Sequence, residues 1–170
     1  MTQKHEVNVN VEIERIMSVY GNSVARVCCV YLRDRGLAED ASQDTFVKVA
    51  ANIDKLPVID FERAWIMRIA VNTCKDILRS SWYRKERMNI PVHTMQLEDA
   101  NHDLDAIIDR DSLFSCIVNL PIRYKDVILL HYYQGLTIRE VAGVIRVSHS
   151  TVQRRIKKAE SLIKEVISNG

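Results

Sequence analysis

The stretch that most constrains the fold is residues 135–163, which read GLTIREVAGVIRVSHSTVQRRIKKAESLI. Thr137 followed by Glu140 is the signature of a capping box, in which a hydroxyl and a carboxylate satisfy free amides at a helix start. Ser148 is a good N-cap for a second helix. After each cap, apolar residues recur at helical spacing: Ile138, Val141, Ala142 and Ile145, then Val152, Ile156, Ala159 and Ile163. The sequence therefore predicts two short helices joined by a tight turn.

The second helix of this pair has a polar, positively charged outer face. In a helix-turn-helix, one helix braces a second that lies in the major groove of DNA. Arg, Lys and Gln on that second helix reach phosphates and base edges. The alternative is an ordinary helical hairpin with a solvated basic face, but caps, spacing and charge together favour DNA reading. The residues of this face are His149, Ser150, Gln153, Arg154, Lys157 and Lys158.

The turn between the two helices contains Arg146, where such turns often place glycine. A residue other than glycine in a left-handed conformation costs about 1 kcal/mol, because its Cβ crowds the backbone. The sequence predicts strain at this position without excluding the turn.

The composition favours helices and limits the classes of site. Five Gly and three Pro in 170 residues leave few interruptions, so an all-α fold is expected. No apolar run approaches the length of a membrane span, and the N-terminus lacks an apolar signal core, so a cytoplasmic protein is expected. Neither the cysteines nor the histidines have metal-ligand spacing, so no metal and no cofactor is expected. Buried thiols are predicted at Cys28, Cys29, Cys74 and Cys116.

The net charge is only +2, but the charges are segregated. Residues 61–90 carry 7 basic and 3 acidic side chains, and residues 113–170 carry 9 and 4. Between them, residues 91–112 carry 1 basic and 6 acidic side chains. Two basic blocks separated by an acidic segment indicate two nucleic-acid contacts on one chain.

Two amphipathic helices are predicted before the first basic block. Residues 11–34 have a helical period with an expected break near Gly21, and Ile13, Ile16, Met17, Tyr20, Val24, Val27, Cys28 and Tyr31 are the predicted core. The next helix, after Gly36, turns Leu37, Ala41, Phe46, Val49, Ala50 and Ile53 inward. Its outer face carries Asp40, Gln43, Asp44 and Val47. The paired carboxylates admit a metal or acid–base site, but no third ligand is near, so a solvated or partner-binding face is favoured.

A loop of about residues 54–62 leads into a third helix, which is expected from about Phe61 onward. Its predicted inner stripe is Ile66, Ile69, Ala70, Thr73 and Ile77, and its polar stripe is Arg68, Asn72, Lys75 and Arg79. The helix runs into Trp82, Tyr83 and Arg84, where aromatic and cationic side chains are neighbours in the sequence. Such a segment suits binding of single-stranded nucleic acid through phosphate neutralisation and base stacking. A plain basic helix end, favoured by the helix dipole, is the alternative.

The remaining pattern gives the domain organisation. Residues 86–111 have no sustained period, include Pro91 and hold the acidic cluster, so they are interpreted as a linker. A four-helix module follows from Leu113, with a break at Pro121. The prediction is an all-α chain of two small helical domains, residues 1–86 and 112–170, joined by a flexible acidic linker over residues 87–111.

The order of these features resembles a known family. The chain is similar to bacterial RNA polymerase sigma factors of the extracytoplasmic-function (ECF) type, the minimal two-domain class of the sigma-70 family. AEDASQDTF resembles the acidic helix of that family, and WIMRIAVNTCKDILR resembles its promoter-melting helix. Leu120-Pro121, GLTIREVAGVI and STVQRRIKKA resemble its promoter-reading module, so the resemblance covers about residues 10–165.

The resemblance implies roles for these residues. Asp40, Gln43, Asp44 and Val47 would bind the clamp coiled coil of core RNA polymerase, whose flap is also an expected partner. The loop over residues 54–63 and the third helix would bind the −10 element through Arg63, Arg68, Asn72, Lys75, Arg79, Trp82, Tyr83 and Arg84. The −35 element would be read by His149, Ser150, Gln153, Arg154, Arg155, Lys157 and Lys158. An anti-sigma factor, membrane-anchored in some members, is a further expected partner.

The leading hypothesis is an initiation factor that binds core polymerase, recognises two promoter elements and helps to melt DNA. It would not be an enzyme, since the polymerase performs the chemistry. A DNA-binding regulator that uses residues 113–170 alone is the second hypothesis, and it predicts dimers on a palindrome. A hydrolase or phosphotransferase comes last, because no nucleophile–base pair, phosphate loop or metal set is found. Gln153 and Arg154 depart from the residues usual in the family, so the resemblance gives no −35 sequence preference.

Overall fold

The computed structural model describes residues 2–56, 59–80 and 111–169. All regular elements within these ranges are helices, so the predicted all-α class is confirmed. The chain divides into two compact units, Met1–Met95 and Gln96–Gly170. The division falls within the segment that the sequence predicts to be a linker, of which residues 87–110 lie outside the described ranges.

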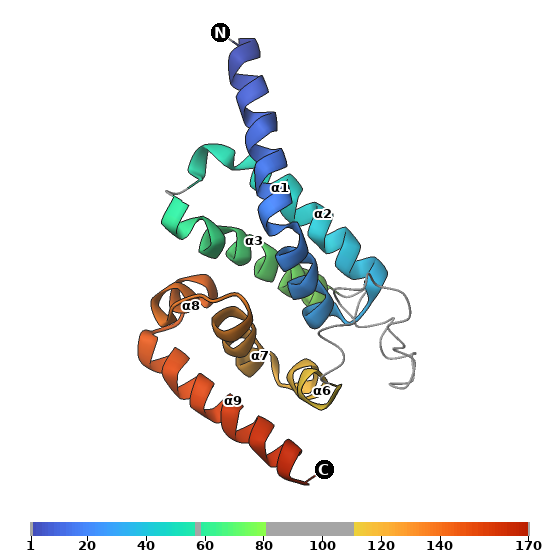
Figure 1. The fold of residues 1–170 in the computed structure, drawn as a ribbon, viewed down its shortest axis with the longest axis vertical. Coiled ribbons are helices and arrows are strands. Elements are labelled where there is room, and N and C mark those ends of the chain that lie inside the picture. Colours follow the sequence, from blue (N-terminus) through green and yellow to red (C-terminus); the bar gives the residue numbers. More distant parts are fainter. Residues whose placement is uncertain (1, 57–58, 81–110, 170) are drawn as a thin grey trace. The chain divides into compact units, whose positions relative to one another are not determined.

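The described part of the first unit is a bundle of three α-helices. They are α1 (Thr2–Leu32), α2 (Arg35–Ala51) and α3 (Ile59–Arg79), and the short 3-10 helix η1 (Ile53–Lys55) lies between α2 and α3. Each of the three α-helices packs against the other two (Figure 1). The apolar stripes predicted from the sequence meet at the centre, where the largest fully buried side chains include Ile16, Val24, Val27, Val49 and Ile66.

The expected break in the first helix is wrong, because α1 continues without interruption through Gly21. A glycine inside a helix costs about 1 kcal/mol relative to alanine. Tyr20 and Val24, on either side of Gly21, are buried against the bundle, and that burial outweighs the cost. The prediction that Met17 belongs to the core is also wrong, because Met17 is 48% exposed, whereas its predicted core neighbour Ile16 is fully buried.

The connections in the first unit use local capping. Asp34 accepts a hydrogen bond from the Leu37 backbone N–H at 2.8 Å and so caps the start of α2. Arg33, which follows α1, has a positive φ of 55° that turns the chain toward α2. The predicted loop before the third helix is shorter than expected, because α3 already begins at Ile59.

The described part of the second unit, residues 111–169, contains α6 (Asp111–Asn119), α7 (Ile122–Ile128), the π-helical turn η2 (Leu129–Tyr133), α8 (Ile138–Ile145) and α9 (His149–Asn169). Pro121 stands between α6 and α7, as the sequence predicts. The long helix α9 packs on α6, α7 and α8, so it forms one wall of this unit (Figure 1). Val127, Leu130, Val141, Val152 and Ala159 are buried between these helices.

The cysteines follow the prediction except at one position. Cys28, Cys74 and Cys116 are buried free thiols, whereas Cys29 is only half-buried. A hydrogen bond with Cys74, together with burial, raises the pKa of Cys28 far above its usual range. Within the described ranges, no three His, Cys, Asp or Glu side chains are grouped so as to hold a metal ion. None of the helices in those ranges is long and apolar enough to cross a membrane.

Candidate nucleic-acid and protein interfaces

The helix pair α8–α9 begins with the predicted caps. Thr137 Oγ1 accepts from the Glu140 backbone N–H at 3.2 Å, and the Thr137 N–H donates to Glu140 Oε2 at 2.7 Å. These reciprocal bonds make a complete capping box. Ser148 Oγ accepts from the Thr151 N–H at 3.2 Å, so it caps α9 as predicted. Both helix starts are therefore fixed by side chains that are next to them in sequence.

The turn between α8 and α9 has the predicted left-handed conformation at Arg146. Its φ and ψ are 57° and 51°. The backbone N–H of Val147 donates to the carbonyl of Ala142 at 3.1 Å, which is the long-range bond of a Schellman motif. This turn sets the direction in which α9 leaves α8.

Helix α9 separates apolar and cationic side chains on opposite faces. Val152, Ile156 and Ala159 are buried, and they hold the helix against the rest of the unit. Arg155 is half-buried. The other residues that the sequence assigns to DNA reading are all exposed over the N-terminal half of α9: His149, Ser150, Gln153, Arg154, Lys157 and Lys158. Such a face can contact phosphates and base edges in a major groove.

A hydrogen bond that the sequence did not predict braces α9. The hydroxyl of Tyr132, in the π-helical turn η2, donates a hydrogen bond to the carboxylate of Glu160 on α9. This bond raises the pKa of Tyr132. In the same turn, His131 Nδ1 lies 2.7 Å from the carbonyl oxygen of Leu136, just before the capping box. The contact between Tyr132 and Glu160 joins residues 28 apart in the sequence, so local patterns could not reveal it.

Polar and cationic side chains lie along α3 in the first unit. Asn72 and Arg79 are exposed, whereas Arg68 and Lys75 are half-buried. Arg79 forms an exposed ion pair with Asp76, with a distance of 3.7 Å from Nη1 to Oδ1. The predicted stripe thus exists, but two of its cations, Arg68 and Lys75, are half-buried rather than fully exposed. Trp82, Tyr83 and Arg84, which the sequence places beyond this helix, lie outside the described residues.

The first turn of α3 places two side chains differently from the sequence prediction. Arg63 is half-buried, and its guanidinium carbon lies 5.2 Å from the centroid of the Tyr20 ring, in a cation–π contact. Phe61 is 53% exposed and was not among the predicted site residues. Its signal in the sequence was a large aromatic residue off the inner stripe of the helix. An exposed ring beside cations is suited to stacking on an unpaired base.

The outer face of α2 is exposed as predicted. Asp40, Gln43 and Asp44 face solvent, and Val47 is 64% exposed among them. Lys48 Nζ lies 2.9 Å from Asp44 Oδ2 and 3.0 Å from the hydroxyl of Thr73 on α3. The lysine therefore links a carboxylate of this face to the neighbouring helix. An apolar side chain surrounded by carboxylates is suited to a protein partner with complementary basic groups.

Two family models match the chain, one in each unit. The model for sigma-70 region 2 matches residues 16–84. The model for sigma-70 region 4 matches residues 110–163. Together they account for both units in the order in which the units occur.

Curated relatives and solved structures agree with these models. An ECF RNA polymerase sigma factor of Bacillus subtilis, SigW, is 23% identical over 160 residues, which span 88% of this chain and 86% of that protein. The ECF sigma-E factor of Haemophilus influenzae is 26% identical over 162 residues, or 89% and 85% of the two chains. The sigma factor RpoE of Bartonella quintana, solved with the anti-sigma factor NepR, has a TM-score of 0.71 at 16% identity, with 92% and 97% of the two chains covered. CnrH, solved with the cytosolic domain of CnrY, has a TM-score of 0.66 at 21% identity, with 92% and 88% covered.

Proposed function

Because the chain belongs to the sigma-70 family, as a sigma factor of the ECF type, we propose that its two units divide the work of transcription initiation between them. The protein binds core RNA polymerase, recognises the −10 and −35 promoter elements and promotes DNA melting. Residues 1–86 would bind core polymerase and the −10 element, residues 112–170 would bind the −35 element, and residues 87–111 would connect them. The observation that carries this proposal is the match of region 2 and region 4 to successive units, each of which has an exposed polar helix face.

The exposed face of α2 is the proposed contact with the polymerase clamp. Its carboxylates, at Asp40 and Asp44, can pair with basic side chains of a partner, and Val47 supplies an apolar centre that is already exposed. Gln43 adds a donor and an acceptor between them. Lys48 contacts both Asp44 on α2 and Thr73 on α3. The proposed core-binding face of α2 is therefore linked directly to α3, the helix proposed to bind the −10 element.

The first turn and outer stripe of α3 are the proposed contact with the −10 element. Arg63, Arg68, Lys75 and Arg79 would neutralise phosphates of the non-template strand, and Asn72 would hydrogen-bond a base edge. Extruding a base from the DNA stack costs only about a few kcal/mol, and binding of that base in a pocket on the protein can offset the cost. Trp82, Tyr83 and Arg84 are included in this contact on their sequence pattern alone.

The N-terminal half of α9 is the proposed reader of the −35 element. Gln153 and Arg154 lie on adjacent exposed positions, where their side chains would face base edges. The remaining polar residues of this face, His149, Ser150, Arg155, Lys157 and Lys158, would hold phosphates on both sides of the groove. The capping box and the Schellman turn support this assignment, because they fix the angle at which α9 leaves its brace.

Regulation and location complete the proposal. Two structural relatives were solved with partner proteins, one of which is an anti-sigma factor. We infer that this chain is also held by an anti-sigma factor, membrane-anchored or not, and works in the cytoplasm. No catalytic activity is assigned to the chain, since the polymerase performs the chemistry, and no cofactor is assigned either.

The core-binding face is tested by competition for purified bacterial core polymerase. The variant carries Asp40→Asn and Asp44→Asn, which remove both charges and keep the shapes of the side chains. Affinity for core is expected to fall about tenfold, which corresponds to about 1.4 kcal/mol. The matched control is Glu39→Gln, which removes an exposed carboxylate of the same helix that is paired only locally with Arg35. Equal affinities of the double variant and the control would contradict the assignment.

A further inference from the structure

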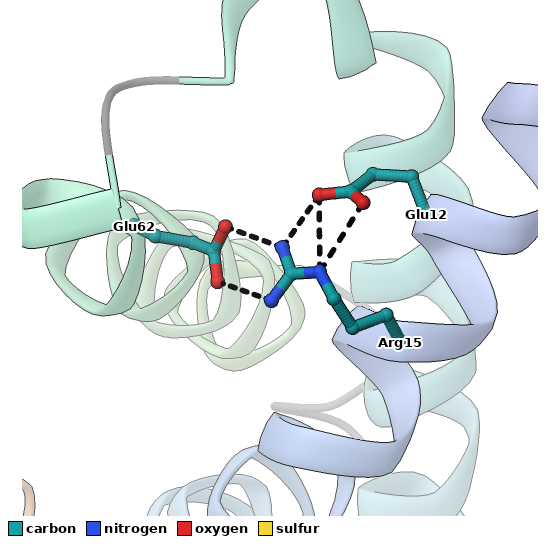
Figure 2. Close-up of polar contacts among 3 residues, drawn as sticks. All are labelled: Glu12, Arg15 and Glu62. Atoms are coloured by element: carbon teal, nitrogen blue, oxygen red, sulfur yellow. Dashed lines mark hydrogen bonds and ion pairs between the residues drawn. The ribbon is translucent and has the colours of Figure 1, made fainter.

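A buried carboxylate joins the start of α3 to α1. Glu62 lies in the first turn of α3, and only 2% of its side chain is exposed. Arg15 on α1 donates to both of its oxygens, from Nη1 at 3.1 Å and from Nη2 at 2.6 Å (Figure 2). The same guanidinium donates to Glu12 on its own helix, at 3.2 Å from Nε and 2.5 Å from Nη2. One arginine is therefore held between two carboxylates, and 47 residues separate it from Glu62 in the sequence.

Tyr20 extends this cluster along α1. Burial and a hydrogen bond with Glu62 raise the pKa of the Tyr20 hydroxyl. The ring of the same tyrosine lies under the guanidinium of Arg63, the residue after Glu62. Helix α1 therefore holds two consecutive residues of α3, one by a bidentate ion pair and the other by a cation–π contact. The next residue toward the N-terminus, Phe61, faces solvent.

The ion pair between Arg15 and Glu62 is expected to add little to the free energy of unfolding. The pair gains little over an apolar pair of similar volume, because burial of the Glu62 carboxylate costs desolvation energy while Arg15, with 40% of its side chain exposed, is partly screened by water. Its geometry, by contrast, is strict: a planar guanidinium fork fits a carboxylate in one orientation. An ion pair at this point therefore restricts the rotation of the first turn of α3 about its axis, and its position along α1, more tightly than apolar packing would.

We propose that Arg15 and Glu62 are positioning residues for promoter melting: they hold the first turn of α3 so that Phe61 and Arg63 meet the single-stranded −10 DNA. Neither residue touches the DNA. Phe61 offers a ring for stacking on an unpaired base, and Arg63 offers a cation for the adjacent phosphate. The inference rests on the proposed −10 contact of α3.

The test compares promoter opening by holoenzymes made with bacterial core polymerase. The template is the promoter upstream of the gene for this protein, and opening is followed by permanganate reactivity of unpaired thymines. The main variant combines Arg15→Met and Glu62→Met, which removes both charges and keeps most of the volume. Its opening rate is expected to fall about ten- to a hundredfold, since a displacement of about 1 Å has that effect on positioned groups. Its thermal stability and its affinity for core are expected to stay near those of the wild type.

A conservative variant covers the case in which the double variant fails to fold. Arg15→Lys keeps the charge but loses the fork, so it should fold with an intact ion pair and still open the promoter several-fold more slowly. The control is again Glu39→Gln, which breaks an exposed ion pair on α2 and should open at the wild-type rate. A folded double variant, or a lysine variant, that opens at the wild-type rate overturns the positioning role.

The wild-type arm separates this inference from the proposed function. If the wild-type holoenzyme opens no promoter, the proposed function is wrong and the positioning role is overturned with it. If the wild type opens the promoter and the variants open it equally well, only the positioning role is overturned.

Discussion

Arg146 allows the energy of a single backbone conformation to be measured at the centre of the DNA-reading motif. Its φ of 57° places a side chain where glycine is the usual residue. We consider the substitutions Arg146→Gly and Arg146→Ala. Both remove the exposed guanidinium, so a difference between them reports the backbone and Cβ terms alone.

The expected difference is the sum of two opposing terms. A Cβ in the left-handed region costs about 1 to 2 kcal/mol, and glycine avoids this cost. Glycine also loses more conformational freedom on folding, which costs about 0.5 to 1 kcal/mol relative to alanine. The glycine variant should therefore be more stable than the alanine variant, by about 0.5 to 1 kcal/mol.

Native-state hydrogen exchange is the suitable assay, because it reports local opening of the second unit separately from the first. Both tryptophans of the chain, Trp65 and Trp82, lie outside the helix-turn-helix, so tryptophan fluorescence would not report it. Amides of α8 and of the first turns of α9 should exchange about two- to fivefold more slowly in the glycine variant, since about 1.4 kcal/mol is a factor of ten. Equal exchange in the two variants, or faster exchange with glycine, would refute the reasoning.

Two further predictions concern DNA. Arg154→Ala should weaken binding of −35 duplex by about 1 to 3 kcal/mol if the guanidinium reads a base, whereas Lys164→Ala, exposed farther along α9, should change the affinity little; an unchanged affinity for the Arg154 variant would reject the assignment. Asn72→Ala should leave duplex binding by the holoenzyme intact but reduce permanganate reactivity in the −10 region, and equal opening by this variant would remove Asn72 from melting.

Local rules in the sequence were sufficient for much of the second unit. The capping box at Thr137, the cap at Ser148 and the left-handed turn at Arg146 all depend on residues within a few positions of one another. The exposed face of α9 followed from helical spacing for the same reason. In each case, interactions among side chains and backbone within a few residues determine which local conformation has the lowest free energy.

Features that depend on distant contacts were not predicted. The continuity of α1 through Gly21 is decided by burial against α2 and α3, which outweighs the local propensity for a break. The pair between Arg15 and Glu62 joins helices that are far apart in sequence, and Glu62 had no local reason to be buried. The contact of Arg63 with Tyr20 likewise appears only once α3 is packed on α1.

The positions of the candidate site residues were predicted from helical spacing, whereas their roles were inferred from the family resemblance. Spacing alone placed Asp40, Gln43 and Asp44 on one exposed face, and it left a solvated face and a partner-binding face equally possible in chemical terms. The resemblance to sigma factors supplied the partner. The assignments to polymerase, −10 and −35 elements are proposals for the individual residues, and the variants described above test them one face at a time.

Run-off transcription tests the central claim most directly. Purified bacterial core polymerase is incubated with and without the full chain on the promoter upstream of its own gene. A transcript of defined length that appears only when the protein is added is the predicted result. No transcript, together with a failure of the protein to co-elute with core polymerase, would contradict its action as an initiation factor.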